Sequence, residues 1–213
     1  MNEPAVRLEE QIISLFSDLE TEIYQGWVLK ETSYHTVIYP LYGGSLNKQD
    51  IVDRIKECEE ISHQKSLSCE FHIVEHTNYY LASLLEDNGY KRHCHIVAEQ
   101  YVNEWTTTPN HNTSKKIRKT KMILNKTAGA NITEKIVTNN GSIVGIRRQE
   151  LLYLPNGRLP CDVEIDDIFQ FAVENQISRI IVNIPDDENL SAYYKESGFH
   201  KVYLYRCYQK EDV

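Results

Sequence analysis

The sequence predicts an α/β protein (mixed α+β) built from two similar units, each a mixed sheet flanked by helices. Amphipathic helical segments alternate with short apolar runs that have the length of strands. One stretch of the first half also matches a stretch of the second half without a gap. The 213 residues, 41% of them hydrophobic, are enough for one large domain or for two small ones that pack tightly.

The internal match contributes most to the prediction of two units. Leu81 to Arg92 aligns with Leu190 to Lys201, and the same offset also aligns the apolar strands that precede them. In both segments a helix is followed by a glycine, Gly89 or Gly198, and then by an aromatic residue. Glycine there can end the helix in a left-handed C-cap, from which the aromatic ring folds back onto the apolar face. We therefore expect two copies of one α/β unit.

The first half is expected to begin with an amphipathic helix, because its apolar residues recur at helical spacing with acids between them. Asn47 or Ser45 is expected to cap the second helix, after the Gly43-Gly44-Ser45 turn. The expected elements are a helix over 6–24, strands over 27–30 and 34–41, a helix over 49–66, a strand over 69–74, a helix over 79–87 and a strand over 93–102.

The second half is expected to begin with a hairpin whose turn is Asn139-Asn140-Gly141, a favourable sequence for tight turns. Pro155-Asn156-Gly157 marks another turn, and Asp166 or Asp167 is expected to cap a helix that runs to Gln176. The expected strands are 136–137, 142–146, 151–154, 159–165, 179–184 and 202–209, with a second helix over 188–197.

These elements suggest an N-terminal half over residues 1–104, a basic linker over 105–126 and a C-terminal half over 127–213. From Lys115 to Lys126 the chain carries six basic side chains and no acid. Such a run usually marks solvated connecting chain, which is the interpretation we favour. The alternative is a local phosphate-binding patch on an otherwise acidic protein.

The net charge of −8 argues against attraction of the whole chain to nucleic acid or to anionic membranes. The five cysteines are odd in number and form no CxxC pair, which suits free thiols in a reducing compartment. The first residues are charged where a signal peptide would be apolar. We therefore expect a cytoplasmic protein without nucleic-acid or membrane partners; the sequence does not predict its oligomeric state.

The run His93-Cys94-His95 contains good zinc ligands. On a strand, however, alternate side chains point to opposite faces, so the three cannot easily converge on one ion. No metal site is expected there. The nucleophile elbow GxSxG, the phosphate-binding Walker loop, HExxH and the dinucleotide-binding fingerprint do not occur in the sequence.

The end of the chain resembles the signature of the Gcn5-related N-acetyltransferase (GNAT) family. Ala192-Tyr193-Tyr194-Lys195-Glu196-Ser197-Gly198-Phe199 is similar to its helix motif LYxxxGF, and Val202 to Tyr208 is similar to its last strand of alternating aromatics. The first half resembles the degenerate N-terminal half of two-domain bacterial members. The resemblance implies a fold of tandem acetyltransferase-like (GNAT) units.

This resemblance implies a reaction in which a primary amine of a small molecule or peptide attacks the thioester of acetyl-CoA. Tyr194 lies at the position of the tyrosine that protonates the departing thiolate. The matching residue of the first half is Leu85, which has no proton to give, so that half is expected to be non-catalytic. The alternative role for Tyr194 is that of a packing residue.

The cleft beside the fourth and fifth strands of the second half is the expected site. Val163 and Ile165 of the expected fourth strand, together with Asn189, are the implied contacts for the cofactor. Glu164 is a candidate proton relay for the attacking amine, or else a strand residue that faces solvent. The family often has an asparagine seven residues before the helix tyrosine, and this chain has Asp187 there.

The chain departs from the family at the loop that binds the CoA pyrophosphate. Members usually carry an Arg/Gln-x-x-Gly-x-Gly/Ala loop whose backbone N–H groups hold the phosphates. Between Arg158 and Arg179 this chain has no glycine and no lysine or arginine, but it has five acidic residues. Their negative charges would repel a pyrophosphate. Two functions therefore remain open: an acetyl-CoA-dependent N-acyltransferase, and an inactive binding or regulatory protein of the same fold.

Overall fold

The computed structural model describes residues 3–15, 21–32, 35–40, 47–74, 79–102, 118–121, 133–139, 141–155 and 157–210. The chain divides into two compact units. Unit 1 comprises Met1–His95 and Tyr203–Val213, and unit 2 comprises Ile96–Val202. No helix among the described residues is both long enough and apolar enough to cross a membrane.

This division differs from the boundaries expected from the sequence. The second half was expected to run without interruption from 127 to 213, whereas residues 203–213 group with the N-terminal unit. Most of the expected linker, 105–126, lies outside the described residues. Residues 118–121 within it form a strand, so that part of the basic run belongs to a sheet.

Unit 1 is a mixed sheet with helices on both faces. Its strands follow the order β1-β2-β3-β4-β11-β5, in which β3 and β4 are parallel and the pairs β1/β2, β2/β3 and β4/β11 are antiparallel. The elements are α1 (Glu3–Leu15), β1 (Thr21–Tyr24), β2 (Trp27–Glu31), β3 (His35–Tyr39), α2 (Lys48–Gln64), β4 (Ser68–Val74), α3 (Tyr79–Asp87), and parts of β5 (Lys91–Tyr101) and β11 (His200–Gln209).

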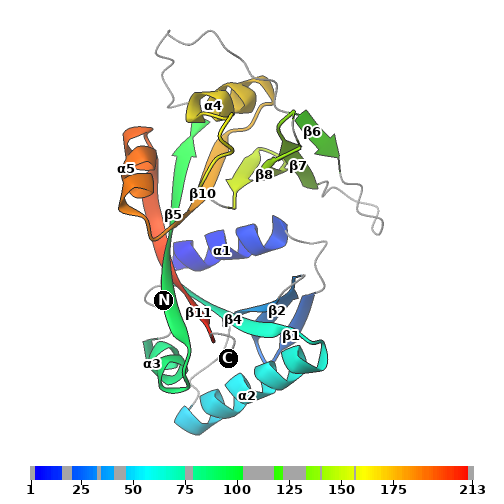
Figure 1. Cartoon of the computed structure of the whole chain (residues 1–213), viewed down its shortest axis with the longest axis vertical. Coiled ribbons are helices and arrows are strands. Elements are labelled where there is room, and N and C mark those ends of the chain that lie inside the picture. The colour runs from blue at the N-terminus through cyan, green and yellow to red at the C-terminus, as the bar shows by residue number, and fades with distance from the viewer. Residues whose placement is uncertain are drawn as a thin grey trace. The chain divides into compact units, whose positions relative to one another are not determined.

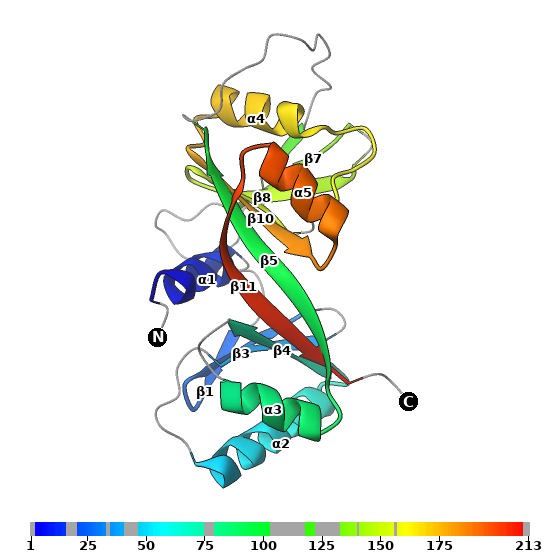
Figure 2. The ribbon, with the colours of Figure 1, turned by 90° about the vertical axis from the view of Figure 1, so that its left-hand side faces the viewer.

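The main core of unit 1 lies between its sheet and helices α2 and α3, and α1 covers the other face (Figures 1 and 2). Phe71 is at the centre of this core. Its ring lies edge-on to those of Trp27 and Tyr90, at centroid distances of 6.0 and 5.3 Å. Ile13 of α1 packs on Val37 and Tyr39 across the opposite face. Alternation along each strand therefore sends successive side chains to two different environments.

Unit 2 is also a mixed sheet. Its strands follow the order β5-β10-β9-β8-β7-β6, in which β9 and β10 are parallel and the pairs from β9 to β6 are antiparallel. The elements besides β5 are β6 (Arg118–Lys121), β7 (Thr133–Val137), β8 (Ile143–Arg148), β9 (Leu151–Leu154), α4 (Ile165–Glu174), β10 (Arg179–Pro185) and α5 (Glu188–Glu196).

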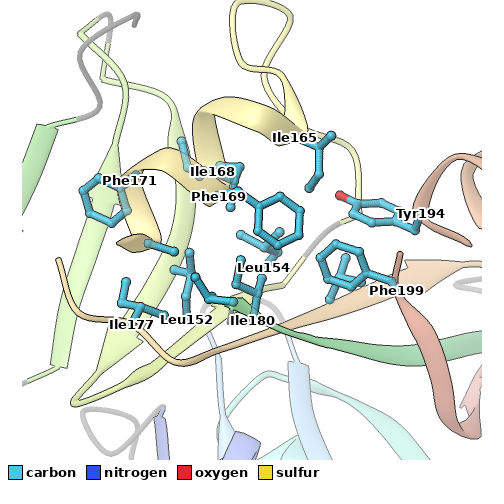
Figure 3. Packing of buried hydrophobic residues seen from close by; sticks show 14 of the residues in the cluster. Leu152, Leu154, Ile165, Ile168, Phe169, Phe171, Ile177, Ile180, Tyr194 and Phe199 are labelled. Atoms are coloured by element: carbon cyan, nitrogen blue, oxygen red, sulfur yellow. The ribbon is translucent and has the colours of Figure 1, made fainter. Parts of the chain in front are cut away.

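The core of unit 2 forms where α4 and α5 pack on this sheet (Figure 3). Phe169 of α4 lies 5.9 Å from Phe199, and Phe199 lies 5.1 Å from Tyr194 of α5, all measured between ring centroids. Leu152 and Ile180 of the central parallel strands complete the cluster and are fully buried. The aromatic residue after the α5 glycine therefore anchors α5 to α4.

The two matched segments have the same local structure. Gly89 follows α3 with φ of 83° and Gly198 follows α5 with φ of 91°, as expected for left-handed C-caps. The amide of Tyr90 donates to the carbonyl of Leu85 at 3.0 Å, and the amide of Phe199 donates to that of Tyr194 at 2.9 Å. The two expected glycine caps are confirmed, and α2 begins after Asn47, whose side chain accepts from the Asp50 amide. The expected cap of α4 is wrong, because Glu164 is the N-cap and Asp166 and Asp167 lie in the first turn of the helix.

Two expected elements are wrong. The helix expected over 6–24 is α1, which ends at Leu15, and Thr21–Tyr24 is strand β1 paired with β2. The strand expected over 159–165 is irregular up to Glu164, which is the N-cap of α4. The chain turns there because the amide of Val163 donates to the Pro160 carbonyl at 2.9 Å. The strand that precedes α4 is therefore β9, and Glu164 is not a strand residue.

A buried acid in unit 1 gives a pH-dependent prediction. Glu9 of α1 is buried, accepts a hydrogen bond from the Tyr203 hydroxyl and lies near His72. Burial outweighs both interactions and raises the pKa of Glu9 above its usual 4.5. A raised carboxyl pKa contributes stability that is present below the usual pKa and is lost as pH rises through the folded pKa. Glu9→Gln should therefore gain stability relative to wild type as pH rises from about 4 to 8.

Urea unfolding of the two proteins across that pH range measures this difference. Glu10→Gln, one residue along α1 at a less buried position, is the matched control for loss of a carboxylate from this helix. Parallel curves for Glu9→Gln and wild type would show that burial does not perturb Glu9 in the folded chain.

Candidate functional site

The candidate site of unit 2 lies where the parallel strands β9 and β10 end. Leu151 to Leu154 pair in register with Arg179 to Val182. The carboxyl ends of parallel strands meet at one edge of a sheet, which is where open α/β sheets bind ligands. Helices α4 and α5 begin beside this edge, so the structure brings most of the predicted site residues to it.

Tyr194 of α5 is fully buried, with 0% of its surface exposed. Its hydroxyl donates a hydrogen bond to the Gly157 carbonyl at 2.8 Å. Its ring lies edge-on to those of Phe199 and Tyr193, so packing and a hydrogen bond both hold it. Burial raises the pKa of Tyr194 above its usual range, which makes the hydroxyl a weaker acid than an exposed tyrosine.

Gly157 extends the hydrogen bonding between the β9 and β10 segments beyond their last paired residues, Leu154 and Val182. Its amide donates to the Asn183 carbonyl of β10 at 2.7 Å, and the Asn183 side-chain amide donates to the Pro155 carbonyl at 3.2 Å. A Cβ atom at position 157 would lie 3.1 Å from the Asn183 carbonyl oxygen and 3.2 Å from a methyl carbon of Leu190. The segment that follows β9 is therefore held closely between β10 and α5.

The N-terminus of α4 is acidic, and the amides of Glu164 and Ile165 at its start are hydrogen-bonded within the chain. The Glu164 amide donates to the Asp167 carboxylate at 3.0 Å, and the Ile165 amide donates to the Tyr193 hydroxyl at 3.3 Å. Asp166 lies in the same first turn. Burial raises the pKa of Tyr193, and the charges of Asp166 and Glu164 add to this effect. The acids stabilise the helix through its dipole and capping.

The N-terminus of α5 is capped by Asp187. Its carboxylate accepts from the amides of Asn189 and Leu190, both at 3.1 Å, and lies 3.5 Å from the Arg158 guanidinium. The side chain of Asn189 is exposed. Asp187 therefore has a structural role as the helix cap, which uses its oxygen for backbone amides.

Solved structures of similar fold cover nearly the whole chain. A GCN5-related N-acetyltransferase from Kribbella flavida superimposes with a TM-score of 0.61 at 10% identity, over 98% of this chain and 96% of that one. The chain has the GCN5-related N-acetyltransferase fold. A second such protein, from Sphaerobacter thermophilus, gives a TM-score of 0.56 at 11% identity over 95% and 85% of the two chains. No protein-family model and no curated protein matches the sequence.

Within this acetyltransferase fold the predicted site residues fall into two groups. Val163 and Ile165 are buried in the apolar cluster that also holds Tyr194, whereas Glu164 and Asn189 are exposed on the first residues of α4 and α5. The hydroxyl of Tyr194 is the only polar side-chain group of these five that is buried in this cluster.

Sequence reasoning missed Gly157 and Asn183, which hold the segment between the strands. The sequence predicts a turn at Gly157, and only the fold shows that its carbonyl accepts a hydrogen bond from the Tyr194 hydroxyl. It also missed the true start of α4, although a signal was present. Val163 and Ile168 flank the capping residues Glu164 and Asp167 at the spacing of a hydrophobic staple, and both belong to one apolar cluster.

Acetyl-CoA, the acyl donor that the resemblance implies, does not fit this edge as the residues stand. A pyrophosphate needs free backbone N–H groups and positive potential at a helix N-terminus. Here the amides of Glu164 and Ile165 are already bonded, and the N-cap and first turn of the helix carry three acids, Glu164, Asp166 and Asp167. Arg158, the one basic residue between Arg148 and Arg179, lies beside Asp187 instead.

Proposed function

We propose that this chain is a binding or regulatory protein of the acetyltransferase fold, and that its β9–β10 edge does not carry out acetyl-CoA chemistry. The observation that supports this most strongly is the hydrogen bond from the fully buried Tyr194 hydroxyl to the Gly157 carbonyl. Through this bond the hydroxyl of Tyr194, the expected general acid, stabilises the fold.

A general acid must come within hydrogen-bond reach of the atom that it protonates. The Tyr194 proton points to a backbone carbonyl, and the Gly157 segment fills the space above β10 through its own bond to Asn183. Releasing the hydroxyl would leave a buried carbonyl without this donor, at a cost of about 1–3 kcal/mol. The geometry therefore favours a packing role for Tyr194.

Electrostatics supports the same proposal. Like charges 4 Å apart repel by about 1 kcal/mol in water and by more where water is excluded. A pyrophosphate at the start of α4 would face Glu164, Asp166 and Asp167. The basic residue of the segment between β9 and α4, Arg158, is paired with Asp187. The acids that cap α4 thus make this helix a poor anion site.

The second candidate function is transfer of an acetyl group from acetyl-CoA to a primary amine of a small molecule or peptide. Two observations favour it: Tyr194 lies on α5 at the motif position, and β9 and β10 are paired in parallel beside the two helix N-termini. Under this function Tyr194 and Glu164 are the catalytic candidates, and Val163, Ile165 and Asn189 are the cofactor contacts.

Calorimetric titration of the full chain with acetyl-CoA separates the two functions. We expect no saturable heat at millimolar acetyl-CoA, with an active acetyltransferase of the same fold as the positive control. Saturation with a micromolar Kd would support the enzyme instead, and it would stabilise the chain by about 2.7 kcal/mol at a ligand concentration of 100 Kd. A mixed panel of amines, assayed for release of free CoA, then tests turnover in the same sample.

A further inference from the structure

A cluster of metal-binding side chains lies in unit 1, on the face of its sheet opposite the main core. Glu70 and His72 are alternate residues of β4, and Cys207 of β11 is the register partner of His72. Their neighbours Cys69 and Phe71 point to the opposite face, into the core beneath α2 and α3. The strand register therefore places an oxygen, a nitrogen and a sulfur donor side by side.

The donor atoms of these three residues all lie within 4.8 Å of one another. Within the described part of the chain this is the one group of three such side chains at that spacing. Glu70 and Cys207 are buried, while 14% of the His72 side chain and 10% of the Glu70 side chain remain exposed. The cluster is thus enclosed, with a small part of His72 and Glu70 accessible to solvent.

Neighbouring side chains hold the imidazole of His72 in place. The Tyr205 ring stacks on it with 4.9 Å between the ring centroids, and the Tyr39 ring lies edge-on to it with 5.1 Å between the centroids. His95 stacks on the far side of Tyr205 at 5.0 Å. The Nε2 atom of His72 faces the Glu70 carboxylate. A site whose ligands are already oriented loses little entropy when it binds.

A second set of contacts orients Glu70. The side-chain amide of Gln209, the register partner of Glu70, donates to one carboxylate oxygen, while His72 contacts the other. Hydrogen bonds of this kind fix the direction of ligating side chains in metal sites. In the absence of an ion the same contacts form a buried hydrogen-bond network. A purely structural network of this kind is the alternative to a metal site.

We propose that Glu70, His72 and Cys207 bind one divalent transition-metal ion of the zinc class. Carboxylate oxygen, imidazole nitrogen and thiolate sulfur are the ligands that Zn²⁺ uses, and thiolate disfavours Mg²⁺ and Ca²⁺. On binding, the Cys207 S–H bond breaks, its proton passes to solvent and a metal–sulfur bond forms without redox change. One carboxylate and one thiolate balance the two positive charges, and a water molecule completes four-coordination.

Co²⁺ is the probe, added to the full chain after removal of metals with a chelator. We expect one Co²⁺ per chain, a thiolate-to-cobalt charge-transfer absorption in the near ultraviolet, and loss of that absorption when Zn²⁺ displaces Co²⁺. Mg²⁺ should produce no displacement. Wild-type protein without the charge-transfer absorption would overturn the proposal, whatever the behaviour of the variants.

Variants then locate the ion. Cys207→Ser should abolish the charge-transfer absorption, and His72→Gln should weaken Zn²⁺ binding by about tenfold or more. Cys69→Ser is the matched control, because it alters a buried cysteine of β4 that points to the opposite face of the sheet. Absorption that survives in Cys207→Ser but disappears in Cys69→Ser would assign the ion to other ligands and refute the site.

Discussion

Tyr194→Phe should lower the free energy of unfolding by about 1–3 kcal/mol. The substitution keeps the ring and its contacts with Phe199 but removes the hydroxyl that donates to the Gly157 carbonyl at 2.8 Å. Because this tyrosine is fully buried, water cannot readily replace the lost donor. Chemical denaturation of wild type and variant measures the difference.

Tyr193→Phe is the matched control, one residue earlier on α5. Its side chain is 39% exposed and accepts a hydrogen bond from the Ile165 amide, so solvent can take over that role. The loss should stay below about 1 kcal/mol. If Tyr194→Phe instead left the free energy of unfolding unchanged and abolished acetyl-CoA-dependent turnover, the Tyr194 hydroxyl would be a catalytic group. That result would contradict the proposed structural role.

Gly145→Ala should destabilise unit 2 by about 1–3 kcal/mol or more, because β8 and β9 approach too closely for a side chain at this position. A Cβ atom there would lie 2.7 Å from the Tyr153 carbonyl oxygen and 3.0 Å from a methyl carbon of both Leu152 and Leu154. The first contact is with backbone, so relief requires the strands to move apart. Thermal and urea unfolding both report the loss.

Gly141→Ala, in the turn that joins β7 to β8, is the control for this prediction. Gly141 has a φ of 87° and no atom within 4 Å of a Cβ built on it, so the cost is that of the left-handed backbone alone, about 1–2 kcal/mol. A loss well below about 1 kcal/mol in Gly145→Ala would contradict the close approach of β8 and β9.

Most helices and strands could be predicted because their apolar periodicity is strong. Helix α3 lies where the sequence predicts it, around 79–87, and the glycines after α3 and α5 have the expected positive φ. Strand β1 was missed because Ile23 continues the helical spacing of α1, whereas the strand depends on pairing with β2. Such pairing is a tertiary property that local pattern does not contain.

The candidate site could be predicted only in part. The motif located Tyr194 on the helix after β10, but its hydrogen-bond partner comes from 37 residues earlier in the chain. Val163 and Ile165 alternate with Glu164 as in a strand, although they flank the N-cap of α4. The cluster of Glu70, His72 and Cys207 was not foreseen, because it depends on the register between β4 and the last strand.

The most direct test of the proposed structural role of Tyr194 is amide hydrogen exchange at Gly157, followed by NMR with and without millimolar acetyl-CoA. The Gly157 amide donates to the Asn183 carbonyl at 2.7 Å, and the Gly157 carbonyl accepts from the Tyr194 hydroxyl, so we expect strong protection and an unchanged signal when acetyl-CoA is added. Rapid exchange of this amide, or a saturable shift of its signal with acetyl-CoA, would show that the edge opens to the cofactor and would contradict the proposal.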